Sequence, residues 1–419
     1  MSNQVKKVFE YSWLPVDDIF TIAHFNQLVR YNEQRGNKYF SVGYQKIYFK
    51  NYVGVIQVGN LTLEILPKAD RNEDGDTQKW QAALLNMLRT CKYLKLSSLT
   101  DANLQLRSAS LIDLFFDSFL KEVETLLHRG LNNRYRFHGA NLPALKGKIE
   151  FNRQIADNLT HRERFFTTHQ VYDQDNVHNQ ILKKALILLQ HITTNHHLKV
   201  RAARHFLSFE SVSNIRPNAA TFKKLTFDRK TKDYQYAIKL AELIILQYSP
   251  DLKGGSNNIL AILFDMNQLF ERYIFLNLRK AVSTFEEAQL NVYGQEVSTF
   301  WQGRTIRPDI VLTYQSEGRE KKLIIDTKWK VLPSADPSIH DLRQMYAYNL
   351  HLGATRSILL YPKTDQESTE HLPFEKSVYA TVDHSCRIYF LDLFDKTGKI
   401  NRDIGRQIIR EMEIVEEPK

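Results

Sequence analysis

The sequence has few cysteines and no long apolar run, and these two absences narrow the class of protein. Its two cysteines, Cys91 and Cys386, lie far apart in a chain of 419 residues. They support neither a disulfide framework nor a zinc site, and they fit a reducing compartment. No apolar stretch is long enough for a membrane-spanning helix, and Met1–Glu10 lacks the apolar core of a signal peptide. We therefore expect a cytoplasmic protein that does not use a membrane.

The sequence also lacks a phosphate-binding loop of the form G-x-x-x-x-G-K-[ST]. The nearest segment, Lys146-Gly147-Lys148, has neither the earlier glycine nor the final Ser or Thr. The chain should therefore not bind a nucleoside triphosphate by this route.

Positively charged residues, in contrast, are in excess, and the formal net charge is +10. This balance favours a polyanionic partner such as nucleic acid, although charge alone does not identify one.

Length and residue pattern predict an α+β protein with several domains. A chain of 419 residues is long enough for two or three domains, and its apolar fraction of 43% is ordinary for a globular protein with a sizeable core. We expect a β-rich module over residues 1–75, a mainly helical region over 76–250, and an α/β domain with a mixed sheet over 251–419.

The β-rich module contains a hairpin pattern between Val53 and Lys68. Two β-rich runs flank Gly59-Asn60, a pair typical of a two-residue turn. In the second run the apolar positions alternate with Thr62 and Glu64, which places these two side chains on the opposite face. The pattern predicts a short projecting hairpin with a polar tip.

The middle of the chain is dominated by helical spacing of apolar residues. A polar, acidic segment, Ala69–Gln78, first reads as a linker. The predicted helices then cover Lys79–Leu94, Ser110–Arg129, Val177–His197, Lys199–Phe209 and Tyr234–Tyr248. Between them, basic and aromatic residues interleave over 134–149. Such a segment suits contact with a phosphate backbone and bases, and it equally suits a solvated loop beside a hairpin.

The candidate catalytic residues follow a short apolar run, Leu323–Ile325, which reads as a buried strand. Because side chains alternate along a strand, Asp326 and Lys328 should point the same way and Thr327 the opposite way. A carboxylate and an ammonium are thereby held side by side where the strand leaves the core.

A second strand pattern, Ile310–Tyr314, follows Asp309 and is joined to the first by a polar segment containing Gly318. A hairpin of these two strands would bring Asp309 near Asp326. Two carboxylates can bind Mg²⁺ together with water and phosphate oxygens, which suits metal-assisted phosphodiester hydrolysis. Lys328 would orient or activate the attacking water, or stabilise charge on the phosphate. The alternative is a hairpin with a surface ion pair.

Further elements flank this hairpin in a definite order. A helix pattern over Met266–Ala281 carries Glu271, a strand is predicted over Asn291–Phe300, and another over Ser357–Tyr361. A helix pattern over Asp341–Leu350 carries Gln344 and Tyr348 four residues apart, on one face. This order resembles the core of the PD-(D/E)xK nuclease superfamily, and Gln344 with Tyr348 resembles the Q-x-x-x-Y element of its RecB-like branch.

Other segments resemble the McrC family, the nuclease subunits of McrBC-type restriction systems of phage defence. The resemblance covers Val53–Lys68, Leu145–Ile149, Asp175–Lys183, Met266–Glu271 and the nuclease motif. It implies a subunit that cuts double-stranded DNA only when joined to a McrB-like hexameric AAA+ GTPase. The GTP would be bound by that partner, and the N-terminal part of this chain would dock into the pore of the hexamer. Dimerisation through the nuclease domain is a further option.

The resemblance also implies roles for individual residues. Asp309 and Asp326 would hold Mg²⁺, and Lys328 would act on water. Gln344 and Tyr348 would position DNA or the strands of the site. Glu271 would contribute a further acidic group, or it is an ordinary carboxylate on a helix surface.

Two other functions stay open. The chain could be a non-catalytic assembly subunit that activates a GTPase and uses a nuclease fold as a scaffold. It could also be a stand-alone PD-(D/E)xK DNA nuclease. The intact triplet of Asp309, Asp326 and Lys328 argues against the first, and the long region before the nuclease domain argues against the second.

Overall fold

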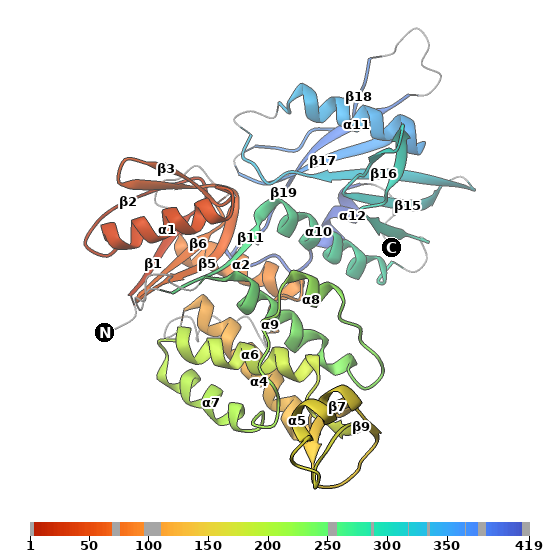
Figure 1. The fold of residues 1–419 in the computed structure, drawn as a ribbon. Coiled ribbons are helices and arrows are strands. Elements are labelled where there is room, and N and C mark those ends of the chain that lie inside the picture. The colour runs from red at the N-terminus through yellow and green to blue at the C-terminus, as the bar shows by residue number, and fades with distance from the viewer. Residues whose placement is uncertain are drawn as a thin grey trace. The chain divides into compact units, whose positions relative to one another are not determined.

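The computed structural model describes residues 4–68, 76–95, 110–249, 258–285, 289–316, 318–332, 336–364, 366–375 and 383–412. Within these limits the protein is α+β with several sheets, as expected (Figure 1). Two compact units are found. The helical unit holds Gln57–Asn60 and Leu111–Ile262, and the sheet unit holds Gln4–Ile56, Leu61–Ser110 and Leu263–Lys419, as far as these are described. The three-part functional division stays a prediction. None of the described helices is both long and apolar enough to cross a bilayer.

The helical unit is built on amphipathic helices whose apolar sides form its core. They are α4 (Leu111–Arg129), α6 (Val177–Ile192), α7 (His196–Leu207) and α9 (Gln235–Gln247), with short α8 (Ala219–Lys223), η1 (Lys232–Tyr234) and β10 (Tyr248–Ser249). The predicted helix Val177–His197 is wrong at its end, because Asn195 caps the next helix by accepting hydrogen bonds from the backbone of His197 and Leu198.

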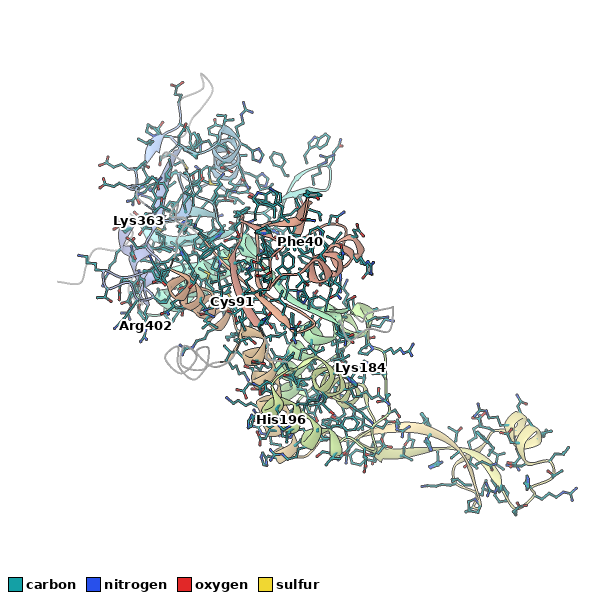
Figure 2. All side chains as sticks on the ribbon, turned by 90° about the vertical axis from the view of Figure 1, so that its left-hand side faces the viewer. Phe40, Cys91, Lys184, His196, Lys363 and Arg402 are labelled. Atoms are coloured by element: carbon teal, nitrogen blue, oxygen red, sulfur yellow. The ribbon has the colours of Figure 1, made fainter. Side chains whose placement is uncertain are left out.

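A long β ribbon leaves this helical unit, and we call residues 134–173 the arm (Figures 1 and 2). Its elements are β7 (Arg134–Leu142), β8 (Lys148–Ile149), α5 (Phe151–Asn158) and β9 (Phe165–Asp173). Antiparallel pairing of β7 with β9 runs unbroken from Arg134↔Asp173 to Leu142↔Phe165. The segment left open between loop and nucleic-acid surface is thus mostly ordered strand.

The N-terminal segment contributes one helix and most strands of two sheets, and the larger sheet is completed by β10 and β11 from later in the chain. The larger sheet has the strand order β1-β6-β5-β11-β10, and the smaller one the order β2-β4-β3. The strands are β1 (Gln4–Phe9), β2 (Trp13–Pro15), β3 (Phe40–Gly43), β4 (Lys46–Phe49), β5 (Tyr52–Val58), β6 (Leu61–Leu66) and β11 (Ile259–Asp265). Helix α1 (Ile22–Gln34) was not predicted, and it buries Leu28 and Tyr31 on one side.

The predicted hairpin Val53–Lys68 exists as β5 and β6, but the prediction that it projects is wrong. Both strands are buried along their whole length, because β5 and β6 occupy the interior of the larger sheet. Thr62 and Glu64, which alternate with the apolar residues, are buried as well. Helix α2 (Thr77–Thr90) covers this face, and Gln81 Nε2 donates to Glu64 Oε2 at 2.7 Å.

Helix α2 also corrects the predicted linker Ala69–Gln78. The helix already begins at Thr77, because Asp76 accepts hydrogen bonds from Gln78 N at 2.9 Å and Lys79 N at 3.2 Å. The earlier part of the predicted linker, residues 69–75, lies outside the described residues.

The C-terminal part of the sheet unit is organised by a mixed sheet with the order β12-β15-β16-β17-β19-β18. The hairpin β15–β16 is antiparallel, whereas β16, β17 and β19 run parallel. This confirms the expected mixed sheet. Its strands are β12 (Asn291–Gly294), β15 (Ile310–Ser316), β16 (Arg319–Thr327), β17 (Arg356–Pro362), β18 (Leu372–Pro373) and β19 (Ser385–Leu391).

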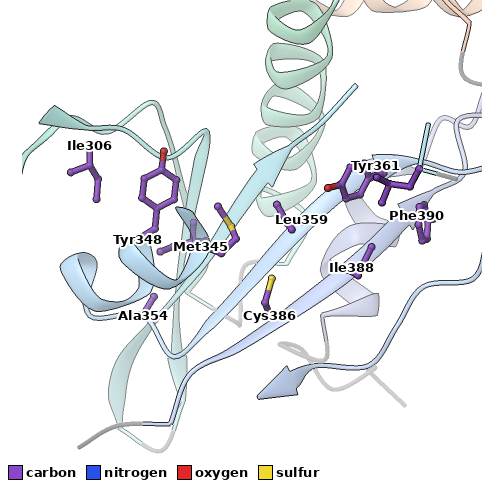
Figure 3. Close-up of a cluster of buried hydrophobic side chains, with 11 residues drawn as sticks. Ile306, Met345, Tyr348, Ala354, Leu359, Tyr361, Cys386, Ile388 and Phe390 are labelled. Atoms are coloured by element: carbon purple, nitrogen blue, oxygen red, sulfur yellow. The ribbon is translucent and has the colours of Figure 1, made fainter. Parts of the chain in front are cut away.

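Helices α10 (Met266–Val282), α11 (Ile339–Leu352) and α12 (Ile404–Glu411) accompany this sheet. Helix α11 packs Met345 and Tyr348 into a buried cluster with Leu359 and Tyr361 of β17 (Figure 3). The packing fixes the rotation of α11 about its axis, and therefore decides which of its polar residues face the end of β16.

The predicted strand Asn291–Phe300 is wrong as a single element. It breaks at Gln295, whose φ is 52°, into β12 and a separate strand β13 (Ser298–Trp301). Strand β13 forms its own two-stranded hairpin with β14 (Arg304–Ile306). This hairpin lies in the chain directly before Asp309.

Candidate active site

The β15–β16 hairpin places the two aspartates opposite each other. Ile310 pairs with Ile325, so Asp309 and Asp326 flank the last paired position at the same end of the hairpin. Parallel pairing of Asp326 with Leu359 of β17 buries the second carboxyl, which is only 1% exposed. The sequence therefore predicted this hairpin and the approach of its aspartates correctly.

Asp309 is held in place by Thr327, the residue between Asp326 and Lys328. Its Oδ2 accepts hydrogen bonds from the backbone N of Thr327 at 2.8 Å and from Thr327 Oγ1 at 2.9 Å. Thr327 was expected to point away from Asp326 and Lys328, but this does not take it out of the site, because its hydroxyl reaches Asp309 before β15. One oxygen of Asp309 is thus fixed by the backbone and the hydroxyl of Thr327.

Lys328 completes the predicted triplet. Its Nζ lies 2.5 Å from Asp326 Oδ2 and 3.3 Å from Gln344 Oε1. The lysine backbone N also donates to Leu360 O at 2.8 Å, which extends the pairing with β17 by one residue. The ammonium is therefore held beside Asp326, as the sequence predicted.

Gln344 and Tyr348 form a chain of hydrogen bonds that ends at the loop before Asp309. Gln344 Nε2 donates to Tyr348 Oη at 2.7 Å, and Tyr348 Oη donates to the carbonyl of Arg307 at 3.1 Å. Since Gln344 also accepts from Lys328, this pair connects the lysine on one side of the site to the Asp309 loop on the other. The structure brings both predicted supporting residues to the triplet.

Glu271 of α10 lies at the margin of the site. Its Oε1 accepts a hydrogen bond from Gln295 Nε2 at 2.7 Å. Burial raises the pKa of Glu271, and the nearby charge of Asp309 raises it further. Glu271 is therefore electrostatically linked to Asp309, while its Oε1 is hydrogen-bonded to Gln295.

Burial and mutual repulsion disfavour ionised carboxyls in this site. Burial raises the pKa of Asp326 to about 7, the charge of Asp309 adds to this effect, and Lys328 opposes it. Burial also raises the pKa of Asp309, against the hydrogen bonds from Thr327. For Lys328, burial favours the neutral amine, but the neighbouring aspartates outweigh burial and raise the pKa of the lysine. Lys328 is therefore a cation at neutral pH.

Comparison with known proteins identifies the family. A family model described as "McrBC 5-methylcytosine restriction system component" matches residues 47–362, which include the hairpin, the triplet and both supporting residues. The chain belongs to this family. The resemblance to McrC drawn from sequence segments is thereby confirmed.

Similar proteins are found among both curated and solved examples. The type IV methyl-directed restriction enzyme EcoKMcrBC of Escherichia coli K12 is 22% identical over 241 residues, 56% of this chain and 69% of that protein. A structure of Thermococcus gammatolerans McrB AAA+ hexamers with bound McrC has a TM-score of 0.69 at 22% identity, covering 98% of this chain and 100% of the matched chain. The Thermococcus gammatolerans McrBC complex gives a TM-score of 0.50 at 23% identity, covering 67% and 88%. These likenesses establish a shared fold.

Asp341 is a site residue that the sequence reasoning did not identify. It is buried in the first turn of α11, and its carboxylate lies 2.6 Å from Lys330 Nζ and 3.7 Å from Lys328 Nζ. Its position three residues before Gln344 could have revealed it, because residues three apart share a helix face. Asp341 therefore holds the side chains of Lys328 and Lys330, which follow β16, close to α11.

Trp329 is a second residue that was missed. Its indole Nε1 donates to Glu10 Oε1 at 2.6 Å, and its ring meets Phe270 of α10 at a centroid distance of 5.0 Å. The residue after Lys328 is thus anchored in the core of the sheet unit. No local pattern predicts this contact, because Glu10 and Trp329 are separated by 319 positions in the sequence.

The donor set fits a hard divalent cation. Among the described residues, no three His, Cys, Asp or Glu side chains gather closely enough to hold a metal by themselves. Mg²⁺ requires less, since one or two carboxylates suffice when water and phosphate oxygens complete its shell. Asp309 and Asp326 repel each other in a buried setting, and a cation between them would relieve that repulsion.

Proposed function

We propose that this chain is the DNA-cleaving subunit of a McrBC-type restriction system, with a nuclease site of the PD-(D/E)xK kind. The observation that carries the proposal is the convergence of Asp309, Asp326 and Lys328 at one end of the mixed sheet. The hydrogen bonds from Lys328 through Gln344 to Tyr348 support the same site. A scaffold without chemistry would gain nothing from keeping these buried charges together.

Asp309 and Asp326 are the groups that would hold Mg²⁺, which supplies Lewis-acid polarisation of a phosphate oxygen when bound. Lys328 acts as a cation. It orients the attacking water or stabilises charge that develops on the phosphate, and its raised pKa makes it a poor general base at neutral pH. Gln344 restrains the direction of the ammonium by accepting its hydrogen bond.

We further infer that a McrB-type AAA+ GTPase is the partner. The solved relative is described as McrB AAA+ hexamers with bound McrC, and this sequence has no phosphate-binding loop. GTP is then bound and hydrolysed by the partner, and double-stranded DNA is the shared substrate.

The arm suits docking to this partner better than the buried hairpin β5–β6. Strands β7 and β9, nine residues each, extend for about 30 Å at ~3.4 Å per residue. Helix α5 carries Phe151 and Ile155, and Leu159 follows as its C-cap. These three residues, spaced by four, are all exposed. An exposed apolar stripe of this kind marks a protein interface.

The site is tested by cleavage of plasmid DNA with the chain, its partner, GTP and Mg²⁺. Asp326→Asn and Lys328→Ala should each reduce the cleavage rate at least ~100-fold, the scale of losing one electrostatic contribution to a transition state. Stimulation of the partner's GTP hydrolysis should be retained. Asp392→Asn is the matched control, because Asp392 pairs with Lys363 on the surface of the same sheet unit.

The outcomes separate the three candidate functions. Wild-type-like cutting by Asp326→Asn would refute the site. GTPase stimulation without any cutting by the wild type would favour the non-catalytic subunit, and efficient cutting without the partner would favour the stand-alone nuclease. Replacing Phe151, Ile155 and Leu159 together by serine should abolish stimulation, and unchanged stimulation would remove the docking role from the arm.

A further inference from the structure

The short hairpin formed by β13 and β14 exposes aromatic side chains next to the site. Phe300 is 57% exposed and Trp301 is 56% exposed, and Val297 before them is exposed as well. The turn is sharp, with φ of 43° at Gln302 and 78° at Gly303. Exposed apolar groups gathered at one element mark an interaction surface.

Both ends of this hairpin are bonded to the candidate active site. On the side before β13, Gln295 N donates to the carbonyl of Asp309 at 2.9 Å, and its side chain donates to Glu271. On the side after β14, the carbonyl of Arg307 accepts from Tyr348. The hairpin is therefore anchored on the residues that frame the triplet.

The hairpin also rests on helix α11. Ser298 Oγ lies 2.8 Å from His351 Nε2, and the Phe300 ring meets the His351 ring edge-to-face at 5.7 Å. Ile306 is the buried residue of the hairpin and joins the cluster of Met345 and Tyr348 (Figure 3). These contacts hold the base in place while the tip stays exposed.

The tip combines an aromatic face with positive charge. The Arg304 guanidinium lies 5.7 Å from the centre of the Trp301 ring. Arg304 and Arg307 are both exposed. A nucleotide chain offers a base to stack on an aromatic ring and a phosphate to pair with a guanidinium, so this combination fits nucleic acid better than an apolar protein surface.

Geometry places such a contact close to the reaction. Four residues of β13 reach about 13 Å from the base of the hairpin at ~3.3 Å per residue. Bases of one strand are ~3.4 Å apart along the duplex axis. The tip can therefore meet DNA within about four base steps of a phosphate bound at Asp309 and Asp326.

We propose that the β13–β14 hairpin contacts the DNA beside the cleavage point, with Trp301 stacked on a base that is unstacked from its neighbour and Arg304 on a backbone phosphate. The proposal rests on the proposed function, since it takes the DNA to lie across the triplet. It adds an element that holds or deforms the substrate and performs no chemistry of its own.

The test uses the full chain carrying Asp326→Asn, so that no DNA is cut, and a short fluorescent duplex at low salt. Trp301→Ala should weaken binding between about 5-fold and 100-fold, the range for loss of one base–aromatic contact, and Trp301→Phe should restore most of it. Arg304→Ala should reduce the dependence of affinity on salt. Tyr44→Ala is the matched control, because Tyr44 is an exposed aromatic residue of the same unit at 87% exposure.

A second measurement separates failure of this inference from failure of the proposed function. With the Asp326 site intact, the wild type should cut DNA in the presence of the partner, and Trp301→Ala should cut more slowly. If the wild type cuts and Trp301→Ala binds and cuts equally well, the hairpin proposal is wrong. If Trp301→Ala instead alters the association state of the free chain without changing DNA affinity, the surface serves a second copy and the proposal is also wrong.

Discussion

Glu10 provides a stability prediction that can be worked out from the structure. This residue follows β1 and is only 2% exposed. Its Oε1 accepts hydrogen bonds from Trp329 Nε1 at 2.6 Å and from Lys68 N at 3.1 Å. Burial raises the pKa of Glu10 to about 8, although these two hydrogen bonds work in the opposite direction.

The sign of the effect follows from proton binding. Between its ordinary value of 4.5 and the folded value of about 8, Glu10 binds more protons in the folded chain than in the unfolded chain. Stability should therefore fall as the pH rises through this window. At ~1.4 kcal/mol for each pKa unit, the loss approaches an upper limit of roughly 5 kcal/mol above the folded pKa.

Glu10→Gln removes this titration and keeps an oxygen that can accept both hydrogen bonds. The free energy of unfolding of the variant, relative to the wild type, should rise by several kcal/mol between about pH 5 and about pH 9. A constant penalty of about 1–3 kcal/mol is expected at every pH, because the new amide N–H groups are buried and Glu10 Oε2 has no hydrogen-bond partner within the described part of the chain. The pH dependence, and not the offset, is therefore the result to measure.

Urea unfolding followed by tryptophan fluorescence is the assay. The four tryptophans of the sequence, Trp13, Trp80, Trp301 and Trp329, all belong to the sheet unit, so the signal reports on that unit. Glu33→Gln on the exposed side of α1 is the control. If the difference between Glu10→Gln and wild type is the same at both ends of the pH range, burial does not keep Glu10 protonated and the reasoning is refuted.

Two further predictions test the support of the site and the order of the arm. Tyr348→Phe removes the hydroxyl between Gln344 and the Arg307 carbonyl. It should slow plasmid cleavage about 10-fold with little change in melting temperature, because ~1.4 kcal/mol of transition-state stabilisation is lost with the positioning contact. An unchanged cleavage rate would mean that the tyrosine is purely structural. Gly147→Ala would place a Cβ 2.5 Å from the Thr168 carbonyl oxygen at a φ of 80°, and should disturb the arm and reduce GTPase stimulation. Gly398→Ala is the control. Its φ is 77° and no atom of the described residues lies within 4 Å of the new Cβ, so it carries only backbone strain of about 1–2 kcal/mol. Equal loss of stimulation in both variants would contradict this account.

The local sequence pattern was sufficient to predict the hairpin at the centre of the site, but it was insufficient to predict the contacts that surround it. The hairpin β15–β16 could be predicted because apolar runs and a glycine-containing turn fix its register, and register fixes the neighbours of Asp309 and Asp326. The Glu10–Trp329 contact could not, because it joins residues separated by 319 positions. Glu10 and Trp329 meet only because separate elements of the sheet unit pack together, and no sequence pattern links those elements.

Alternation was misleading where a helix covers the second face of a sheet. Alternation placed Thr62 and Glu64 on the opposite face of a hairpin that was expected to project, but both residues are buried, and Gln81 of α2 donates a hydrogen bond to Glu64. The same pattern of alternating polar residues therefore occurs in an exposed hairpin and in this buried one. An exposed and a buried strand with this pattern differ only in whether the polar side chains have a hydrogen-bond partner in the protein, and that partner belongs to another element.

The charge balance of the site connects the sequence motif to the proposed chemistry. Asp309, Asp326 and Asp341 surround Lys328, whose pKa they raise, and Lys330 pairs with Asp341. Asp309 and Asp326 are then left with one shared ammonium and with raised pKa values of their own. Stability alone would favour replacing such a buried, under-compensated pair by apolar residues. A divalent cation that arrives with the DNA would supply the missing charge, so the unfavourable electrostatics of the free chain are the physical reason to expect metal-dependent hydrolysis here.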